Sequence, residues 1–155
     1  MELKEEYDVI IAGAGPAGSM AAQVCAEGGL SVLLLEKRQE IGAPKRCAEG
    51  IGIKPLKLLG FTGNENFITQ KINGAIVVSP DNTEVMVEYG GDRGVILERK
   101  LFDKALCYRA AEAGAKIIAK AYVTGIIKEN GKISGAKVKI DGETLEIKSK
   151  ILITT

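Results

Sequence analysis

The feature that most constrains this chain is a cluster of three glycines, Gly13, Gly15 and Gly18, in the order Gly-Ala-Gly-Pro-Ala-Gly. An apolar, β-branched run, residues 7–12, precedes the cluster, and a stretch of small residues that begins with proline, residues 16–27, follows it. This order predicts a buried strand, a tight turn and a helix. The first glycine permits the turn, the second lets a phosphate approach the backbone, and the third lets the helix pack closely on the strand.

A second apolar run, residues 31–36, ends in Glu36, about 20 residues after Gly15, as in a dinucleotide-binding fingerprint. The two strands and the helix form a βαβ unit, whose crossover should be right-handed. The helix N-terminus would offer N–H groups to phosphates, and Glu36 would accept hydrogen bonds from ribose hydroxyls. A carboxylate at this position repels the 2′-phosphate of NADP, so the residues themselves leave FAD and NAD open. A turn that merely connects strand and helix is the disfavoured alternative.

Composition removes several classes of chemistry. The 155 residues include no histidine, which excludes His-ligated zinc and Ser-His-Asp catalysis. Basic and acidic residues number 21 and 20, and this balance argues against nucleic-acid binding. The three cysteines, Cys25, Cys47 and Cys107, are too far apart for a CxxC motif, so we expect no metal site and free thiols in a reducing, cytoplasmic compartment.

The rest of the chain predicts an α/β fold. We expect a Rossmann-like FAD/NAD(P)-binding parallel sheet, an antiparallel β-meander as its crossover, and the start of a β-sheet substrate region. The elements that carry this expectation are a helical turn at 54–59, hairpin strands at 72–79 and 84–89, an amphipathic helix at 100–113, a strand at 116–123, a three-stranded meander that ends near residue 147, and a last strand at 151–155.

Three segments of the sequence resemble the geranylgeranyl reductase family of flavoproteins, especially the archaeal digeranylgeranylglycerophospholipid reductases. They are YDVIIAGAGPAG, LLEKRQEIGAPKRCAEGI and VILERKLFDKAL. The first is similar to many flavoproteins of the para-hydroxybenzoate hydroxylase type. The second is much more specific to the reductases, and the resemblance covers most of the chain.

The resemblance implies a non-covalent FAD and an external electron donor, either NAD(P)H or a ferredoxin-like protein. Reduced flavin would deliver hydride to the double bonds of geranylgeranyl chains and so saturate archaeal ether phospholipids, with an isoprenoid ether lipid as the substrate. An aromatic hydroxylase of the same superfamily is the alternative enzyme, and a non-catalytic dinucleotide-binding module is the alternative outside enzymes.

The resemblance also implies which residues touch the flavin. Besides the glycine loop, the contacts carried onto this sequence are Ala17, Glu36, Cys47, Ala48, Gly50, Arg99 and Val123. Cys47 would lie near the isoalloxazine ring and act in catalysis, with Arg46 stabilising a thiolate or the charge of reduced flavin. From the local sequence alone, Cys47 is as well explained as an idle loop cysteine, Arg99 as a surface arginine and Val123 as a core valine.

Members of this family are more than twice as long as this sequence. We therefore expect residues 1–70 and 95–155 to form a truncated FAD-binding domain. Residues 71–94 would form a hairpin that belongs to an incomplete substrate-binding domain. We also expect these 155 residues alone to be inactive and to hold FAD weakly, and peripheral membrane contact would come through a C-terminal part that this sequence lacks.

Overall fold

A computed structural model describes residues 3–44 and 47–155. The chain divides into two compact units. The first, here called the sheet unit, comprises Met1–Ala43 and Asp103–Thr155, and the second, the hairpin unit, comprises Pro44–Phe102. Residues 44–70 and 95–102 thus group with the hairpin in this structure, and their assignment to the FAD-binding domain of a longer protein stays a prediction.

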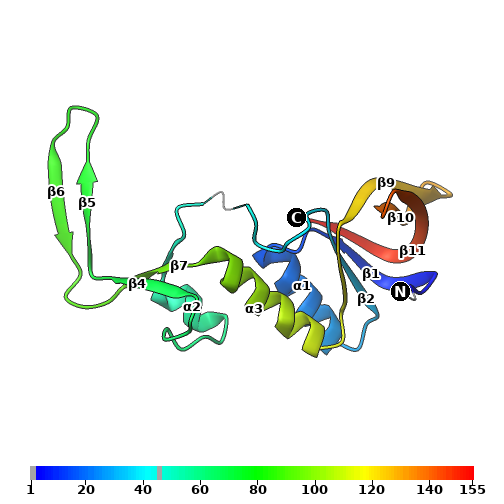
Figure 1. Ribbon diagram of the computed structural model, residues 1–155, viewed down its shortest axis with the longest axis horizontal. Helices are drawn as coiled ribbons and strands as arrows, with labels where there is room; N and C mark the ends of the chain where they lie inside the picture. The colour runs from blue at the N-terminus through cyan, green and yellow to red at the C-terminus, as the bar shows by residue number, and fades with distance from the viewer. Residues whose placement is uncertain (1–2, 45–46) are drawn as a thin grey trace. The chain divides into compact units, whose positions relative to one another are not determined.

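The sheet unit is built on six strands in the order β8-β2-β1-β11-β10-β9 (Figure 1). Their bounds are Glu6–Ala12 for β1, Val32–Glu36 for β2, Lys116–Ala119 for β8, Ala121–Glu129 for β9, Lys132–Ile140 for β10 and Glu143–Thr154 for β11. The pairs β8–β2, β2–β1 and β1–β11 are parallel, and the two remaining pairs are antiparallel. All five residues of β2 are buried, as a central parallel strand requires.

Two helices, α1 (Pro16–Glu27) and α3 (Arg99–Glu112), supply residues to one face of the parallel strands. Small side chains make this packing close: Ala22 of α1 and Ala110 of α3 are fully buried in the same cluster as Val9 and Leu34. The sequence predicted both helices to within one residue at each end, and the buried face of α3 includes the predicted Phe102, Leu106 and Ala110.

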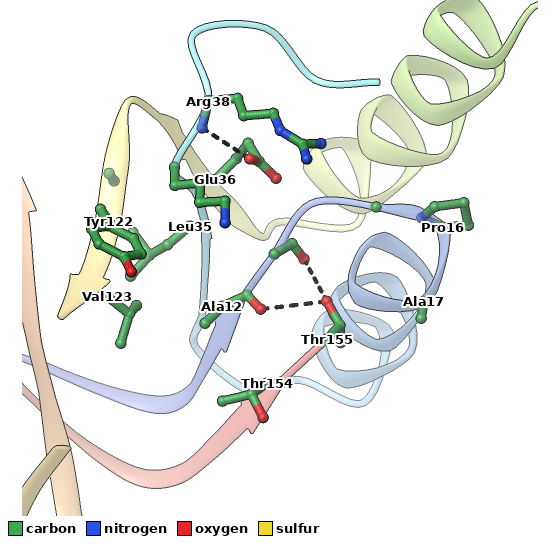
Figure 2. A pocket seen from close by; sticks show the side chains of 14 residues that line it. Ala12, Pro16, Ala17, Leu35, Glu36, Arg38, Tyr122, Val123, Thr154 and Thr155 are labelled. Carbon is green, nitrogen blue, oxygen red and sulfur yellow. Dashed lines mark hydrogen bonds between the residues drawn. The ribbon is translucent and has the colours of Figure 1, made fainter. Parts of the chain in front are cut away.

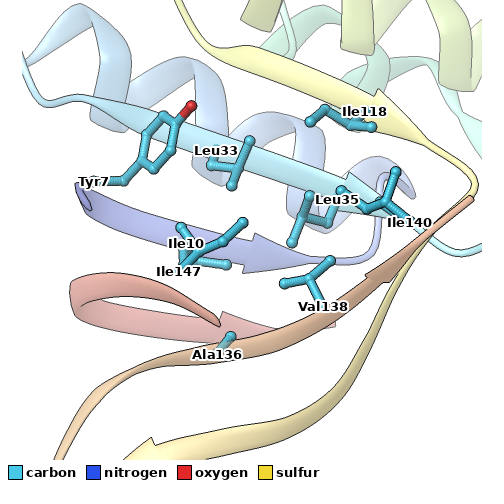
Figure 3. Close-up of a cluster of buried hydrophobic side chains, with 10 residues drawn as sticks. Tyr7, Ile10, Leu33, Leu35, Ile118, Ala136, Val138, Ile140 and Ile147 are labelled. Carbon is cyan, nitrogen blue, oxygen red and sulfur yellow. The ribbon is translucent and has the colours of Figure 1, made fainter. Parts of the chain in front are cut away.

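The meander covers the opposite face of the sheet. Ala136, Val138 and Ile140 of β10 pack with Ile10 and residues of β2 in a second apolar cluster (Figure 3). The two turns of the meander contain Asn130-Gly131 and Asp141-Gly142, and all four residues have positive φ, which explains the predicted hairpin turns. Helices, sheet and meander therefore form three layers with a core on each side of the sheet.

Two strand boundaries differ from the prediction. The strand expected at 116–123 is two strands, because Lys120 has φ 57° and breaks the run between β8 and β9. The strands expected before residue 147 and at 151–155 are instead one 12-residue strand, β11. Its first half pairs with β10 and its second half with β1, so one strand serves both the meander and the parallel sheet.

In its described residues, the hairpin unit contains two small sheets, one short helix and the first residues of α3. Its elements are β3 (Gly50–Gly52), α2 (Ile53–Leu58), β4 (Ile68–Ile72), β5 (Gly74–Val78), β6 (Glu84–Glu88) and β7 (Gly94–Leu97). The helical turn and the β5–β6 hairpin were predicted, whereas β3, β4 and β7 were not. These three form one antiparallel sheet in the order β3-β7-β4.

The core of the hairpin unit is aromatic. Phe61, Phe67 and Phe102 are buried, and their ring centroids lie 5.0 to 5.8 Å apart. The β5–β6 hairpin takes no part in this core, since Ile76, Val85 and most of its other apolar side chains are exposed.

An ionic cluster ties three parts of the sheet unit together. Lys150 of β11 donates to Asp8 Oδ1 of β1 at 2.6 Å, and Ser31, which precedes β2, donates to Asp8 Oδ2 from both its N–H and its hydroxyl at 2.8 Å. These hydrogen bonds, led by the one from Lys150, hold the pKa of Asp8 well below its usual range. The same contact raises the pKa of Lys150.

Candidate nucleotide-binding site

A cavity of about 500 Å³ lies in the sheet unit beside the glycine loop (Figure 2). The strands β1, β2 and β11 reach it with their carboxyl ends, which is where open α/β sheets bind ligands. Its lining residues are Ala12, Gly13, Gly15, Pro16, Ala17, Leu35, Glu36, Lys37, Arg38, Ala121, Tyr122, Val123, Thr154 and Thr155.

Two of the three loop glycines are required by the chain itself. Gly13 has φ +116°, and a Cβ there would lie 2.5 Å from Thr155 Oγ1. A Cβ on Gly18 would lie 1.9 Å from the Gly13 carbonyl oxygen, so only glycine allows α1 to approach the loop. The predicted roles of Gly13 in the turn and Gly18 in packing therefore have a direct steric basis.

Gly15 is different. Its φ is −74°, a value that any residue adopts, and a Cβ built on it would meet nothing within 4 Å. No steric constraint within the described part of the chain calls for glycine here. A side chain would instead project into open space at a residue that lines the cavity, so the absence of a side chain leaves room for a ligand. This is the geometry that close approach of a pyrophosphate needs.

The start of α1 provides the electrostatic part of such a site. Gly15 is the N-cap residue, Pro16 follows it, and no side chain caps the helix. The first turn holds no acidic residue. The N–H groups and the positive end of the helix dipole are thus left for an anion, and Ala17 lies exposed at this end of the cavity.

Glu36 is buried, and backbone N–H groups bind both of its carboxylate oxygens. Oε2 accepts from Ala14 N–H at 3.0 Å, and Oε1 accepts from Arg38 N–H at 2.9 Å. The side chain therefore braces the glycine loop against the end of β2, a role that the sequence did not predict. A carboxylate has about four acceptor positions, so capacity remains for ribose hydroxyls.

The opposite wall of the cavity comes from β9. Val123 lies there as expected, beside Tyr122, whose exposed ring has Lys37 Nζ 5.8 Å from its centroid. Thr155 closes a third side and donates from Oγ1 to the carbonyl oxygens of Ala12 and Gly13 at 3.4 and 3.2 Å (Figure 2). Sequence reasoning missed the roles of Tyr122, Lys37 and Thr155. The only signal was their position next to a predicted contact or at a strand end.

The remaining predicted contacts belong to the hairpin unit and do not line this cavity. Cys47 is exposed and its sulfur accepts from Glu49 N–H at 3.4 Å. Ala48 and Gly50 are exposed, and Arg99 is half-buried at the first position of α3. Arg46 lies outside the described residues. The flavin contacts expected at Cys47, Ala48, Gly50 and Arg99 stay predictions, as do those expected of the residues that line the cavity.

The other thiols are placed differently. Cys107 is buried between α3 and the sheet, and burial raises the pKa of its thiol, whereas Cys25 is half-buried on α1. Residues 3–44 and 47–155 hold no group of three or more His, Cys, Asp or Glu side chains that could bind a metal ion. None of the helices in the described part of the chain has the length and apolar character needed to cross a membrane.

Comparison with known proteins agrees with this geometry. The family model described as FAD binding domain matches residues 6–155. The digeranylgeranylglycerophospholipid reductase of Methanosarcina acetivorans is 47% identical over 97% of this chain, and reductase 1 of the same name from Methanococcoides burtonii is 43% identical. The chain spans only 38% of the length of each of these relatives.

Solved structures give the same picture. A geranylgeranyl bacteriochlorophyll reductase-like protein from Thermoplasma acidophilum superposes with a TM-score of 0.90 at 38% identity, and the match covers 97% of this chain and 39% of that one. The flavin-dependent brominase Bmp2 has a TM-score of 0.78 at 28% identity, and the match covers 97% of this chain and 38% of that one. The anhydrotetracycline hydroxylase OxyS from Streptomyces rimosus, 23% identical with a TM-score of 0.71, shares the fold.

The fold is therefore the predicted α/β, Rossmann-like one, and the resemblance to geranylgeranyl reductases is confirmed. The choice between FAD and NAD, which the residues left open, is decided for FAD. With a family model matched from Glu6 to Thr155, this chain belongs to the FAD binding domain family.

Proposed function

We propose that this chain is the FAD-binding portion of a reductase that saturates the geranylgeranyl chains of archaeal ether phospholipids. The observation that carries the proposal is the open space at Gly15, in a chain 43–47% identical to digeranylgeranylglycerophospholipid reductases. Bound FAD, once reduced by the external electron donor, would supply the hydride for each double bond, and a proton would complete the saturation. The glycine loop and α1 would hold its pyrophosphate, and Glu36 the ribose of its adenosine.

The rest of the proposed enzyme follows from the relatives. Its substrate would be an isoprenoid ether lipid, its electron donor NAD(P)H or a ferredoxin-like protein, and its place the cytoplasm with peripheral membrane contact. The hairpin of residues 71–94 would belong to the substrate-binding domain, which the exposed apolar side chains of β5 and β6 support. An aromatic hydroxylase is not favoured, because two hydroxylases that share the fold, OxyS and aklavinone-11 hydroxylase, are only 23% and 17% identical to this chain, well below the digeranylgeranylglycerophospholipid reductases.

The test is substitution of Gly15 by valine in the full-length protein. We expect Gly15→Val to abolish FAD binding, measured by flavin fluorescence, because its side chain would occupy the pyrophosphate path while the fold stays unchanged. Gly125→Val is the matched control: Gly125 lies in β9 outside the cavity, and its nearest neighbour to a built Cβ is 3.9 Å away. Retention of FAD by Gly15→Val would overturn the assignment of the loop.

The reductase activity needs a separate test. We propose that Cys47 lies beside the flavin ring in the complete enzyme. Its exposed thiol is compatible with this role. Cys47→Ala should then lower turnover of a geranylgeranyl lipid under a strong reductant more than it lowers FAD content. An equal loss of both would make Cys47 a packing residue, and no loss would make it idle.

A further inference from the structure

Ala14, between the first two glycines of the loop, is held at both its N–H and its carbonyl by buried side chains. Its N–H donates to Glu36 Oε2 at 3.0 Å, and its carbonyl accepts from Ser19 Oγ at 3.4 Å. Ser19 is completely inaccessible to solvent. One contact comes from β2 and the other from α1, so two separate elements set the orientation of the two peptide units that flank Ala14. We call this arrangement the Ala14 clamp.

A third element packs behind the clamp. Cys107 of α3 is buried in the same apolar cluster as Ala14. Burial raises the pKa of its thiol, Ser19 lowers it, and the charge of Glu36 raises it.

We propose that Ser19 is a positioning residue for FAD: it fixes the Ala14 carbonyl and so keeps the phosphate loop in its binding shape before the cofactor arrives. Ser19 is not one of the glycines of the fingerprint, and it does not line the cavity. A loop ordered in advance loses less conformational freedom on binding, and that difference appears as affinity. The inference rests on the proposed FAD-binding function and adds to it a residue that shapes the site from behind.

The experiment compares ADP and adenosine as ligands of the full-length protein by titration calorimetry. Loss of one neutral hydrogen bond should weaken ADP binding by about 3- to 10-fold in Ser19→Ala. Adenosine lacks the phosphates that the loop holds, so its affinity should not change. Cys25→Ala is the matched control and should bind ADP like the wild type, because it truncates a side chain of α1 that packs against the same apolar cluster but makes no contact with the Ala14 carbonyl.

Wild-type ADP affinity in Ser19→Ala, or an equal loss for ADP and adenosine, would overturn the proposal. Urea unfolding of each ligand-free variant shows whether a loss of affinity merely follows a loss of stability. A second measurement is independent of any ligand: hydrogen exchange of the Ala14 amide should be at least about tenfold faster in Ser19→Ala. If the wild type binds no ADP, the proposed function fails, and unchanged exchange at Ala14 would still disprove the clamp.

Discussion

The sheet unit and the β5–β6 hairpin have similar apolar sequences and opposite environments. In the sheet unit, Val9 and Ile11 lie under the helices, while Ile10 lies under the meander, and all three are at most 1% exposed. In the hairpin, Ile76 and Met86 are 57% and 69% exposed. Both regions consist of β-branched and other apolar residues that form strands, but in the described residues only the strands of the sheet unit are covered on both faces. The residue types therefore favour an extended backbone in both regions, whereas burial depends on which elements pack against the strand.

The exposed apolar face of the hairpin is unusual for a stable structure. A two-stranded hairpin is only marginally stable in water by itself, and a large apolar surface on such a hairpin is normally covered by another element. The relatives are more than twice as long as the region they share with this chain.

Gly18→Ala in the sheet unit and Gly74→Ala in the hairpin both place a Cβ against a backbone oxygen, at 1.9 and 2.7 Å. Gly18 is buried in α1 against the Gly13 carbonyl of the loop, so we expect the alanine to cost more than about 3 kcal/mol in the free energy of unfolding. The exposed hairpin contributes little to the buried core, so Gly74→Ala should leave the free energy of global unfolding nearly unchanged. Urea unfolding followed by circular dichroism measures both, and equal effects would refute the contrast.

Leu33→Ala and Val85→Ala compare truncations. Leu33 is fully buried in β2 between strands and meander, so its removal should cost about 2–5 kcal/mol in the free energy of unfolding. Val85 in β6 is 56% exposed, and its truncation should cost less than about 0.5 kcal/mol. A cost above about 1 kcal/mol for Val85→Ala would show that another surface covers the hairpin.

Glu36→Ala and Glu65→Ala compare two carboxylates that bind backbone N–H groups. Glu36 holds the glycine loop, whereas Glu65 accepts from Thr62 N–H and Gly63 N–H in a turn of the hairpin unit. We expect Glu36→Ala to weaken FAD binding by about 1–3 kcal/mol, because it loses the charge-assisted bonds to the ribose and frees the loop. Glu65→Ala should leave FAD affinity unchanged. Unaltered affinity in Glu36→Ala would reduce this residue to a structural one.

The smallest expected effect depends on pH. The folded-state pKa of Asp8 is lowered, first by Lys150 and then by Ser31, so its contribution to stability is present above the unfolded pKa of about 3.9 and is lost as the pH falls below it. The urea midpoints of wild type and Asp8→Asn should therefore differ at pH 6 and converge towards pH 3. Asp81→Asn, which changes a hairpin carboxylate, should show no such difference in global unfolding. Parallel pH profiles for wild type and Asp8→Asn would contradict this account.

Much of the sheet unit was predictable because its signals are local. The glycine cluster, the apolar runs on either side of it and the two turn dipeptides each specify their own geometry. The continuity of β11 was not predictable. Residues 143–154 pair with β10 in their first half and with β1 in their second half, and the sequence of a strand does not specify which strands it will pair with. Likewise β7 becomes a strand because it pairs with β3 and β4, which are distant in the sequence.

The candidate site divides in the same way. Gly13, Gly15, Glu36 and Val123 were predicted and line one cavity. The brace from Glu36 to Ala14 was missed, because it joins residues 22 positions apart and depends on how the loop curls over the end of β2. Tyr122 was missed because nothing in the local sequence of a meander strand indicates that an exposed aromatic residue lines a ligand-binding cavity.

The position of β1 also bears on how the protein is made. Its neighbours in the sheet are β2, which follows after one helix, and β11, and the ion pair between Asp8 and Lys150 joins residues 142 positions apart. During translation at about 5–20 residues per second, one edge of β1 therefore waits roughly 10 s for its partner. An apolar strand edge left open for that time can pair with another nascent chain, so a trigger factor or chaperone that shields β1 should raise the yield of folded protein.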